Sequence, residues 1–327
     1  MTDSDRRRGQ QNPLELNAVD DRQYRAKFGR RAVVASLRKQ AAAYFIRKGL
    51  PVHPRYPYRL DSHANWKGNI ILEPVARLVE QEAEKRKRLK QHFALHSFIH
   101  HGLSSQALLW NLLGPLIVDT RWDILTEILR AADISLQGKV DGAELEVEDA
   151  SVLGEYGGQP TSVDMCLTTT ARERVFVEFK FTEAGFGGCS VFGDGDCDGY
   201  NPAHEFDLCY LHRRGRQYWP LMKKHRLVTG SLLTDAQCPF TNLYQVYRLI
   251  LYTLEQGGHF LLLHDGRNPA FVNVDRQGRQ RGLFARALES LPKDARTRYH
   301  ALSVQRMLDL LEPHGLGWLP ELKEKHF

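Results

Sequence analysis

The sequence predicts an α/β (α+β) fold in which helices pack on a mixed sheet, and two observations support this prediction. Apolar residues recur at helical spacing up to residue 132, whereas strict alternation begins after Gly142 and continues through three segments. Helical spacing then returns, and a further apolar, strand-like segment follows. A group of strands placed between helices in this order is typical of a layered domain with helices on a sheet.

Four helices are predicted ahead of the strands, over 31–48, 73–90, 104–113 and 122–132. The third is expected to end at Gly114-Pro115, because proline cannot continue a helical hydrogen-bond ladder. Residues 1–30 are polar and rich in Arg and are expected to form a disordered basic arm. Residues 31–98 are assigned to an N-terminal helical extension.

Three strands are predicted over about 144–156, 161–168 and 174–182. Gly157, Gly158 and Pro160 lie in the first connection and Thr-Thr-Ala-Arg forms the second, which are hairpin-length links typical of an antiparallel meander. After a Gly- and Asp-rich loop, helices are predicted over 204–225, 241–256 and 301–312, and strands over 260–263 and 270–274. We assign 99–290 to the core domain and 291–327 to a C-terminal helical segment.

The composition excludes several classes of protein. Of the 327 residues, 42% are hydrophobic and 26% are charged, which is ordinary for a globular protein and excludes a collagen, a wholly disordered chain and a disulfide miniprotein. No signal-peptide core is present at the N-terminus, and residues 102–118 are too short and too polar to span a bilayer. Five cysteines without a secretory signal suit a reducing compartment, so we expect a cytoplasmic protein with no membrane segment.

Three polar side chains converge on one face of the predicted meander. Side chains alternate along a strand, so Glu178, Lys180 and Thr182 share a face opposite Val175, Val177, Phe179 and Phe181. The preceding strand divides in the same way, with Val163, Met165 and Leu167 on one face and Ser162, Asp164 and Cys166 on the other. Across a short hairpin, Asp164 is expected opposite or near Glu178.

This residue set suits metal-assisted hydrolysis of a phosphodiester. Two nearby carboxylates repel each other, and Mg²⁺ (or Mn²⁺) relieves that repulsion while keeping water positions open for a phosphate substrate. A neighbouring lysine orients or deprotonates the attacking water and offsets charge in the transition state. A solvent-facing salt-bridge cluster is the alternative interpretation of the same three residues.

The segments PTSVD and VFVEFKFTE, joined by a short hairpin, resemble the core of the PD-(D/E)XK nuclease superfamily, which has the restriction-endonuclease-like fold. The stretches SSQAL and NLLGP upstream and Tyr244-Gln245-x-x-Arg248 downstream are similar to a bacterial restriction-endonuclease branch, and the resemblance covers about 100–270. It implies that Asp164 and Glu178 bind the metal and that Lys180 assists the water.

The resemblance also implies a further carboxylate from a helix before the meander. Glu127 is the candidate, with Glu155 on the first predicted strand behind it. Gln245 and Arg248 share one helix face, where they reach a phosphate or the active-site carboxylates, or else form an ordinary polar stripe. One branch of the superfamily carries Gln and Tyr four residues apart on this helix, whereas here Leu249 stands in the second position.

A basic run between residues 208 and 234 contains no acidic residue. Its cations include Arg213, Arg214 and Arg216, and aromatic residues are interleaved with them, as in surfaces that neutralise phosphates and stack on bases. A second run contains Arg276, Arg279 and Arg281. Solvated surface is the alternative, and charge alone does not distinguish DNA from RNA.

Two patterns suggest a second metal site. Cys189, Cys197, Cys209 and Cys238 are four thiols that hold Zn²⁺ or an iron–sulfur cluster if they gather, although no C-x-x-C pair is present. Asp194, Asp196, Asp198 and Glu205 fit the spacing of an EF-hand calcium loop, but no helix is predicted before them. Unrelated buried cysteines and an acidic loop are the alternatives.

These observations favour a Mg²⁺-dependent endonuclease with DNA as its partner, and a homodimer remains open. A non-catalytic nucleic-acid-binding protein that retains the nuclease fold is the second hypothesis, and a metal-binding scaffold centred on 189–238 is the third. The presence of Asp164, Glu178 and Lys180 together favours the enzyme.

Overall fold

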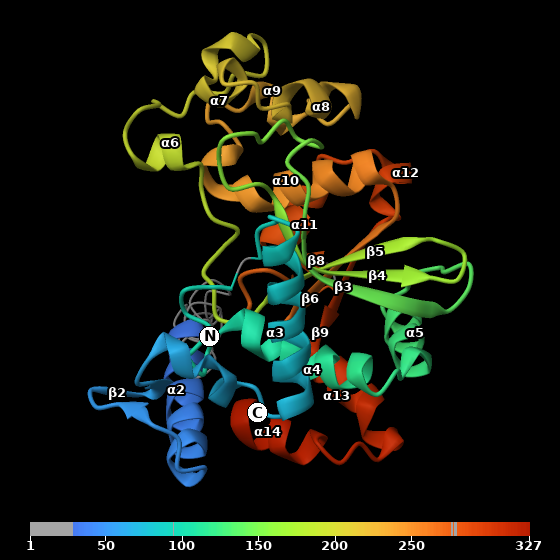
Figure 1. The fold of residues 1–327 in the computed structure, drawn as a ribbon. Coiled ribbons are helices and arrows are strands. Elements are labelled where there is room, and N and C mark those ends of the chain that lie inside the picture. Colours follow the sequence, from blue (N-terminus) through green and yellow to red (C-terminus); the bar gives the residue numbers. More distant parts are fainter. Residues whose placement is uncertain (1–28, 94, 276, 278–279) are drawn as a thin grey trace, which may run out of the picture.

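The computed structural model describes residues 29–93, 95–275, 277 and 280–327. Its centre is a five-stranded mixed sheet with the strand order β3-β4-β5-β6-β9 (Figure 1). The strands are β3 (Val140–Glu148), β4 (Ser162–Thr169), β5 (Arg174–Lys180), β6 (His259–His264) and β9 (Tyr299–Ser303). β3, β4 and β5 form an antiparallel meander, and β6 and β9 extend it with parallel pairing. The predicted mixed sheet flanked by helices is confirmed.

Helices cover both faces of this sheet. On one face Val175, Val177 and Phe179 of β5 join a core with α3 (Glu73–Arg88), α4 (Ser105–Val118), α5 (Trp122–Ala131) and α13 (Val304–Leu311). On the other face Phe176 and Leu262 pack with α8 (Tyr218–Lys224), α10 (Phe240–Gln256) and α11 (Leu283–Leu288). Because side chains alternate along β5, Glu178 and Lys180 share the face of Phe176 and α10.

Helix α4 is the most deeply buried helix that flanks the sheet. Its side chains from Gln106 to Leu116 are all buried, and its N-cap Ser104 accepts a hydrogen bond from the amide of Ala107. The helix continues through Pro115 to Val118 instead of ending at Gly114, because burial of Leu116 in the core outweighs the one ladder hydrogen bond that proline removes.

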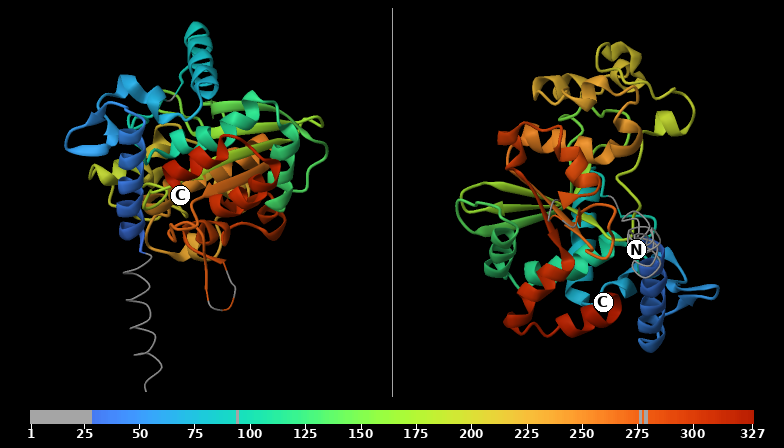
Figure 2. Two further views of the ribbon diagram at one scale, coloured as in Figure 1. Left: turned by 90° about the horizontal axis from the view of Figure 1, so that it is seen from below. Right: turned by 180° about the vertical axis from the view of Figure 1, so that it is seen from behind.

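The N-terminal extension and the last helix pack against each other. The extension contains α2 (Arg30–Arg47), a hairpin of β1 (Val52–His53) and β2 (Tyr56–Leu60), η1 (His63–Asn69) and α3. Figure 1 and the right view of Figure 2 show α14 (Leu319–His326) beside α2. Tyr44 donates a hydrogen bond of 2.6 Å to Glu321, and the buried Lys325 donates to the carbonyl of Asn69. The predicted basic arm, residues 1–30, lies almost wholly outside the described residues.

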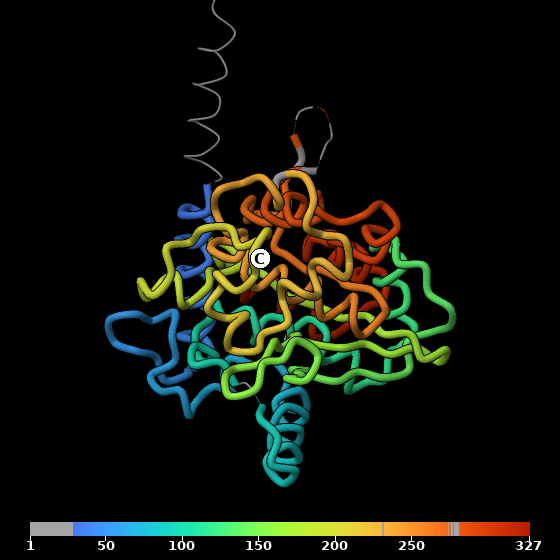
Figure 3. Tube along the Cα trace, turned by 90° about the horizontal axis from the view of Figure 1, so that it is seen from above, coloured from blue at the N-terminus to red at the C-terminus, as the bar shows by residue number. Residues whose placement is uncertain are grey.

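The chain between β5 and α10 forms a lobe of short helices. It holds α6 (Ser190–Gly193), η2 (Phe206–Leu208), α7 (Tyr210–Arg213), α8 and α9 (Ser231–Thr234). Seen from above in Figure 3, this segment, drawn in yellow and gold, loops over the body. The helix predicted over 204–225 is broken, because Gly215 adopts a φ of 87° between α7 and α8 and turns the chain.

The C-terminal segment was predicted to be helical, but it also contains a strand. β9 pairs with β6 in the central sheet, so residues 299–303 belong to the same sheet as the core. β7 (Asn273–Val274) and β8 (Gln280–Arg281) form a separate two-stranded sheet, followed by α11 and α12 (Lys293–Arg296), and η3 (Glu312–His314) precedes α14. The predicted strand over 270–274 is therefore shorter and lies outside the main sheet.

The close approach of α3 and α4 at Gly114 gives a test of the packing. A Cβ atom built at Gly114 would lie 2.5 Å from Cγ1 of Val75. Replacing glycine by alanine within a helix ordinarily stabilises it by about 1 kcal/mol, but we expect Gly114→Ala to lower the free energy of unfolding by about 1–3 kcal/mol through overpacking. Urea unfolding measures the change.

Gly317→Ala is the control for that substitution, because its new methyl group meets open space. The double variant Gly114→Ala/Val75→Ala should recover part of the loss, since the clashing methyl groups are removed. A stabilised Gly114→Ala protein would show that α3 and α4 do not pack this closely.

Candidate active site

The pairing of β4 with β5 sets two carboxylates opposite each other. Met165 pairs with Val177, so the next position in this register places Asp164 opposite Glu178. Asp164 Oδ2 accepts a hydrogen bond of 2.7 Å from the amide of Phe179, which holds its side chain across the strand pair. The juxtaposition of Asp164 and Glu178 that the sequence predicted is therefore present.

Glu178 is held by two neighbours and keeps one oxygen without a hydrogen bond. Its Oε1 accepts from Nζ of Lys180 at 2.7 Å and from Nε2 of Gln245 on α10 at 2.7 Å. Its Oε2 is buried and lacks a hydrogen-bond partner among the described residues. A buried carboxylate oxygen in this state is costly and marks a position for a ligand.

Glu146 of β3 is a third carboxylate at this site that sequence reasoning missed. Its side chain is buried and accepts a hydrogen bond of 2.7 Å from Gln106 of α4. The pairs on either side in the β3–β4 register place Glu146 opposite Asp164. Arg86 of α3 fixes this part of the strand by donating to the main-chain carbonyls of Glu146 (2.6 Å) and Leu145 (2.5 Å).

The strand alternation is interrupted where Glu146 meets Asp164. Glu146 has a φ of 48°, in the left-handed region that side chains other than glycine rarely adopt. Met165 joins the core on the α4 face, whereas Val163 joins the core on the α10 face. The predicted grouping of Val163 with Met165 and Leu167 is thus wrong for Val163, and the interruption brings Glu146 toward the polar face that carries Asp164.

These side chains line a cleft of about 880 Å³. Asp164, Glu178, Lys180, Gln245 and Glu146 all contribute to its wall. The wall also includes residues 158–160 from the loop after β3 and residues 92 and 95–97 from the segment before α4. The cleft opens at the end of the meander, where polar side chains from three strands, α4 and α10 meet.

Burial and mutual repulsion raise the pKa values of the carboxyl groups. Burial is the largest cause for Glu146, Asp164 and Glu178, and the charge of Asp164 raises the pKa of Glu146 further, as Glu178 does for Asp164. Burial alone lowers the pKa of Lys180, but attraction by Glu178, Glu183 and Asp164 outweighs it and raises the pKa overall. Lys180 is therefore protonated at neutral pH, beside carboxyl groups whose ionised forms are destabilised.

Two of the other predicted carboxylates lie elsewhere. Glu127 is exposed on α5, pairs with His314 at 3.1 Å and does not line the cleft. Glu155 lies in the loop after β3, since β3 ends at Glu148 and not at residue 156. It is buried and accepts hydrogen bonds from Arg248 (2.8 Å) and Tyr218 (2.6 Å). Glu127 is placed away from the site, and Glu155 forms a buried ion pair with Arg248.

Some cations of the basic run are exposed, and others form hydrogen bonds within the protein. Arg213 and Arg214 are exposed at the end of α7. Arg216 donates to the carbonyls of Gly154 (3.0 Å) and Tyr156 (3.3 Å), so it packs the lobe onto the loop that lines the cleft. In the second run, Arg281 pairs with Asp275 at 3.0 Å, and Arg276 and Arg279 lie outside the described residues.

The structure gives no support to the second metal site. Within the described ranges, no three His, Cys, Asp or Glu side chains are arranged as a metal site, at these cysteines or in the cleft, so an ion in the cleft would rely on one or two protein carboxylates. Cys189, Cys197, Cys209 and Cys238 are free thiols, and burial raises the pKa of Cys238 to about 12. The acidic loop of the EF-hand-like pattern follows α6, a single turn of helix, and its aspartates are exposed.

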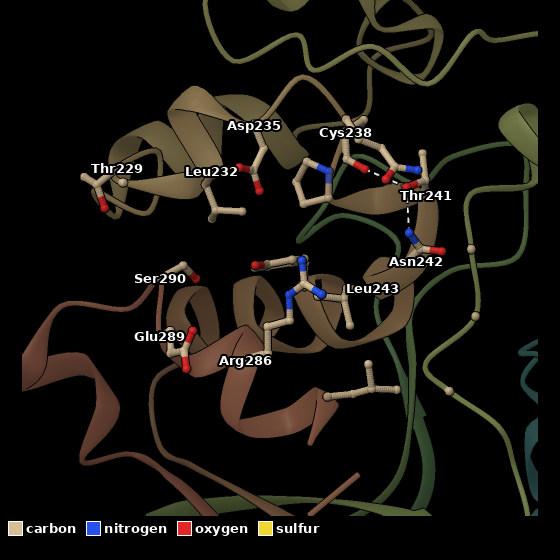
Figure 4. Close-up of a pocket in the computed structure, with 18 of the residues that line it drawn as sticks. Thr229, Leu232, Asp235, Cys238, Thr241, Asn242, Leu243, Arg286, Glu289 and Ser290 are labelled. Atoms are coloured by element: carbon tan, nitrogen blue, oxygen red, sulfur yellow. Dashed lines mark hydrogen bonds between the residues drawn. The ribbon is translucent and has the colours of Figure 1, made fainter. Parts of the chain in front are cut away.

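A separate cavity of about 620 Å³ lies at the start of α10, between α9 and α11 (Figure 4). Its wall includes Cys238, Asp235, Arg286 and Glu289. Apart from Cys238, none of the residues predicted for the site lines it. The cleft at the meander is therefore where Asp164, Glu178, Lys180 and Gln245 of the predicted site lie together.

A mixed sheet with helices on both faces and a carboxylate-lined cleft at its meander defines an α+β protein with a nuclease-like fold. The chain belongs to the REase-ARP family, described as restriction endonuclease associating with ARP, whose model matches residues 38–327. Neither the curated proteins nor the solved structures give a match. The family indicates a nuclease-like function, and none of the described helices is long and apolar enough to cross a membrane.

The raised carboxyl pKa values predict a cost in stability at neutral pH. A folded-state pKa above the unfolded value gives stability that is present at low pH and is lost as the pH rises through the folded-state pKa. We expect Asp164→Asn, which keeps the acceptor for Phe179, to raise the free energy of unfolding of the metal-free protein by about 1 kcal/mol at pH 8, with a smaller gain at pH 5.

Thermal unfolding in the presence of a chelator measures this change. Glu127→Gln is the matched control, because that carboxylate is exposed and should leave the stability within about 0.5 kcal/mol of the parent. A loss of stability in Asp164→Asn at pH 8 would contradict repulsion among the cleft carboxylates.

Proposed function

We propose that this protein is a Mg²⁺-dependent endonuclease of the PD-(D/E)XK type that hydrolyses phosphodiester bonds in DNA. The observation that carries the proposal is the meeting of Asp164, Glu178 and Lys180 with Glu146 in one cleft. The family description, which names a restriction endonuclease, favours DNA as the substrate.

The donor set of the cleft fits a hard divalent cation. Glu178 has a buried oxygen without a partner, and the carboxyl groups of Asp164 and Glu146 are destabilised as anions by burial and repulsion. Mg²⁺ needs only one or two protein carboxylates and completes its shell with water and substrate phosphate. Asp164 and Glu178 would hold the ion, with Glu146 beside them. When bound, it lowers the pKa of a coordinated water and withdraws charge from the phosphate.

The remaining polar side chains orient the carboxylates and offset negative charge. Lys180 keeps its proton, so it donates hydrogen bonds to the attacking water or the phosphate and offsets negative charge as the pentavalent transition state forms. Gln245 fixes the orientation of Glu178 by its hydrogen bond to Oε1. Gln106 does the same for Glu146 from α4.

Cleavage of supercoiled plasmid DNA with and without Mg²⁺ tests the proposal. We expect Mg²⁺-dependent cleavage by the parent protein and a loss of at least about 100-fold in rate for Glu178→Gln, Lys180→Met and Glu146→Gln. Glu127→Gln should cleave at the parental rate.

Two outcomes oppose the assignment. Normal cleavage by Glu178→Gln or Lys180→Met would show that the chemistry occurs elsewhere. Tight DNA binding without cleavage in Mg²⁺ or Mn²⁺ would identify the protein as a non-catalytic binder that retains the fold.

The exposed end of α7 is proposed to contact DNA phosphates. Charge reversal in Arg213→Glu/Arg214→Glu should weaken binding and lower the slope of log affinity against log salt concentration by about two. Reversal at Lys223, which is exposed on α8, tests whether the effect is specific to α7. An unchanged slope would make the end of α7 solvated surface only.

A further inference from the structure

A second groove adjoins the active-site cleft and has no role in the function proposed above. It has a volume of about 320 Å³ and lies between α2, β2 and the segment before α4. It shares His96, Ser105 and Glu183 with the cleft, so the two spaces are neighbours with a common wall. Arg30 at the start of α2 closes one side by donating to the carbonyls of Thr182 (2.9 Å) and Glu183 (3.3 Å).

Arginines stacked on tyrosines form the wall of this groove. The guanidinium of Arg38 lies 5.0 Å from the ring centre of Tyr58, and that of Arg59 lies 4.7 Å from Tyr56 and 5.3 Å from Tyr58. Among the residues that the structure describes, no carboxylate pairs with Arg38 or Arg59. Nε of Arg59 is buried and has no hydrogen-bond acceptor there. Both cations thus lie against tyrosine rings, and Arg59 has a donor that no acceptor of the described residues satisfies.

An exposed aromatic side chain stands beside these cations. Phe98 is 54% exposed although its ring stacks on His101 at a centroid distance of 4.8 Å. Burial and the charge of Arg59 lower the pKa of His101 to about 4, so its ring is neutral at pH 7. Glu183 is the one carboxylate among the residues lining the groove. The groove is thus a cationic surface with an aromatic platform.

We propose that this groove binds an unpaired segment of the DNA substrate, with phosphates on Arg38 and Arg59 and a base against Phe98. This inference rests on the proposed nuclease function, since it names the part of the substrate that the N-terminal extension recognises.

The size and chemistry of the groove favour a single strand over a duplex. Its volume is at the lower end of small-molecule sites, which span about 300–1,000 Å³, so it accommodates a nucleotide unit and excludes a double helix. Base stacking on an exposed aromatic ring requires a base that is free of its partner strand. Planar guanidinium groups recognise phosphate through paired hydrogen bonds, and the tyrosine stacking orients them for that contact.

The position of the groove relates it to the reaction. His96, Ser105 and Glu183 line both the groove and the cleft that contains Lys180. A strand whose phosphate lies at Lys180 would reach the groove across this shared wall. This geometry predicts that the enzyme prefers DNA with an unpaired region next to the cleavage position.

The experiment is a fluorescence-anisotropy titration in the presence of a chelator, so that no cleavage occurs. The probes are a labelled duplex with a single-stranded extension and a blunt duplex of the same sequence. Arg38→Ala/Arg59→Ala should weaken binding to the extended duplex about tenfold and lower its salt slope by about two. Phe98→Ala should weaken it about tenfold with an unchanged salt slope. Binding of the blunt duplex should change by less than about twofold.

Arg31→Ala/Lys39→Ala is the matched control, because both residues are exposed on α2, do not line the groove and remove the same charge. Arg38→Lys/Arg59→Lys keeps the charge and removes the planar fork, so it should retain the salt slope and lose affinity. If the alanine double variant does not fold, the lysine double variant and Phe98→Ala still test whether the groove binds the single-stranded extension.

Several outcomes overturn the inference. Equal losses on blunt and extended duplexes would mean simple phosphate attraction, and losses equal to the control would mean that the groove is not used. Tighter binding of an RNA extension, lost in the same variants, would assign the groove to RNA. Binding is measured without metal, so the groove result does not depend on cleavage. If the parent protein does not cleave DNA, the proposed nuclease is wrong and the groove result still stands. If it cleaves DNA but the groove variants bind normally, the inference about the groove is wrong and the proposed nuclease still stands.

Discussion

The site depends on the register between β4 and β5. One antiparallel alignment sets Asp164 opposite Glu178 and, through β3, sets Glu146 opposite Asp164. A shift of one residue would turn these carboxylates to the opposite face, into the apolar core beneath α4. Apolar side chains on both faces of β5, among them Phe176 and Phe179, fix that register because either shift would bury charge. The hydrophobic core thus holds together three carboxyl groups whose ionised forms repel one another.

The neighbouring helices stabilise this arrangement from both sides of the sheet. Gln106 on α4 and Gln245 on α10 each donate a hydrogen bond to one carboxylate of the cleft. Neutral amide donors fix the orientation of an acid without neutralising its charge, which leaves the anion able to bind a cation. Lys180 supplies a positive charge within the same group through its ion pair with Glu178.

The parts of the fold and site that sequence reasoning predicted are those set by simple periodicity. Alternation in VFVEFKF identified β5 and the shared face of Glu178 and Lys180, and the short turn after β4 implied the meander. Glu146 lies within the predicted strand over 144–156 and was missed because its positive φ departs from strand alternation. Glu127 was chosen on its helix without knowing which face was buried, and the buried stripe of α5 places it in solvent. β9 was missed because its two buried residues, Tyr299 and Leu302, are three positions apart, which does not fit the alternation of a strand.

The contact between α2 and α14 has a consequence for how the protein is made. Tyr44 and Glu321, which join these helices, are 277 residues apart in sequence. At a synthesis rate of about 5–20 residues per second, α2 leaves the ribosome roughly 14–55 s before its partner. During that interval the wall formed by α2 lacks the helix that anchors it, because Lys325 and Glu321 have not yet been joined to the chain. A nascent chain therefore contains the N-terminal extension and the meander, with its carboxylates, before it contains the helix that packs on α2. The packing of the N-terminal extension is therefore completed only when the last residues of the chain have been made.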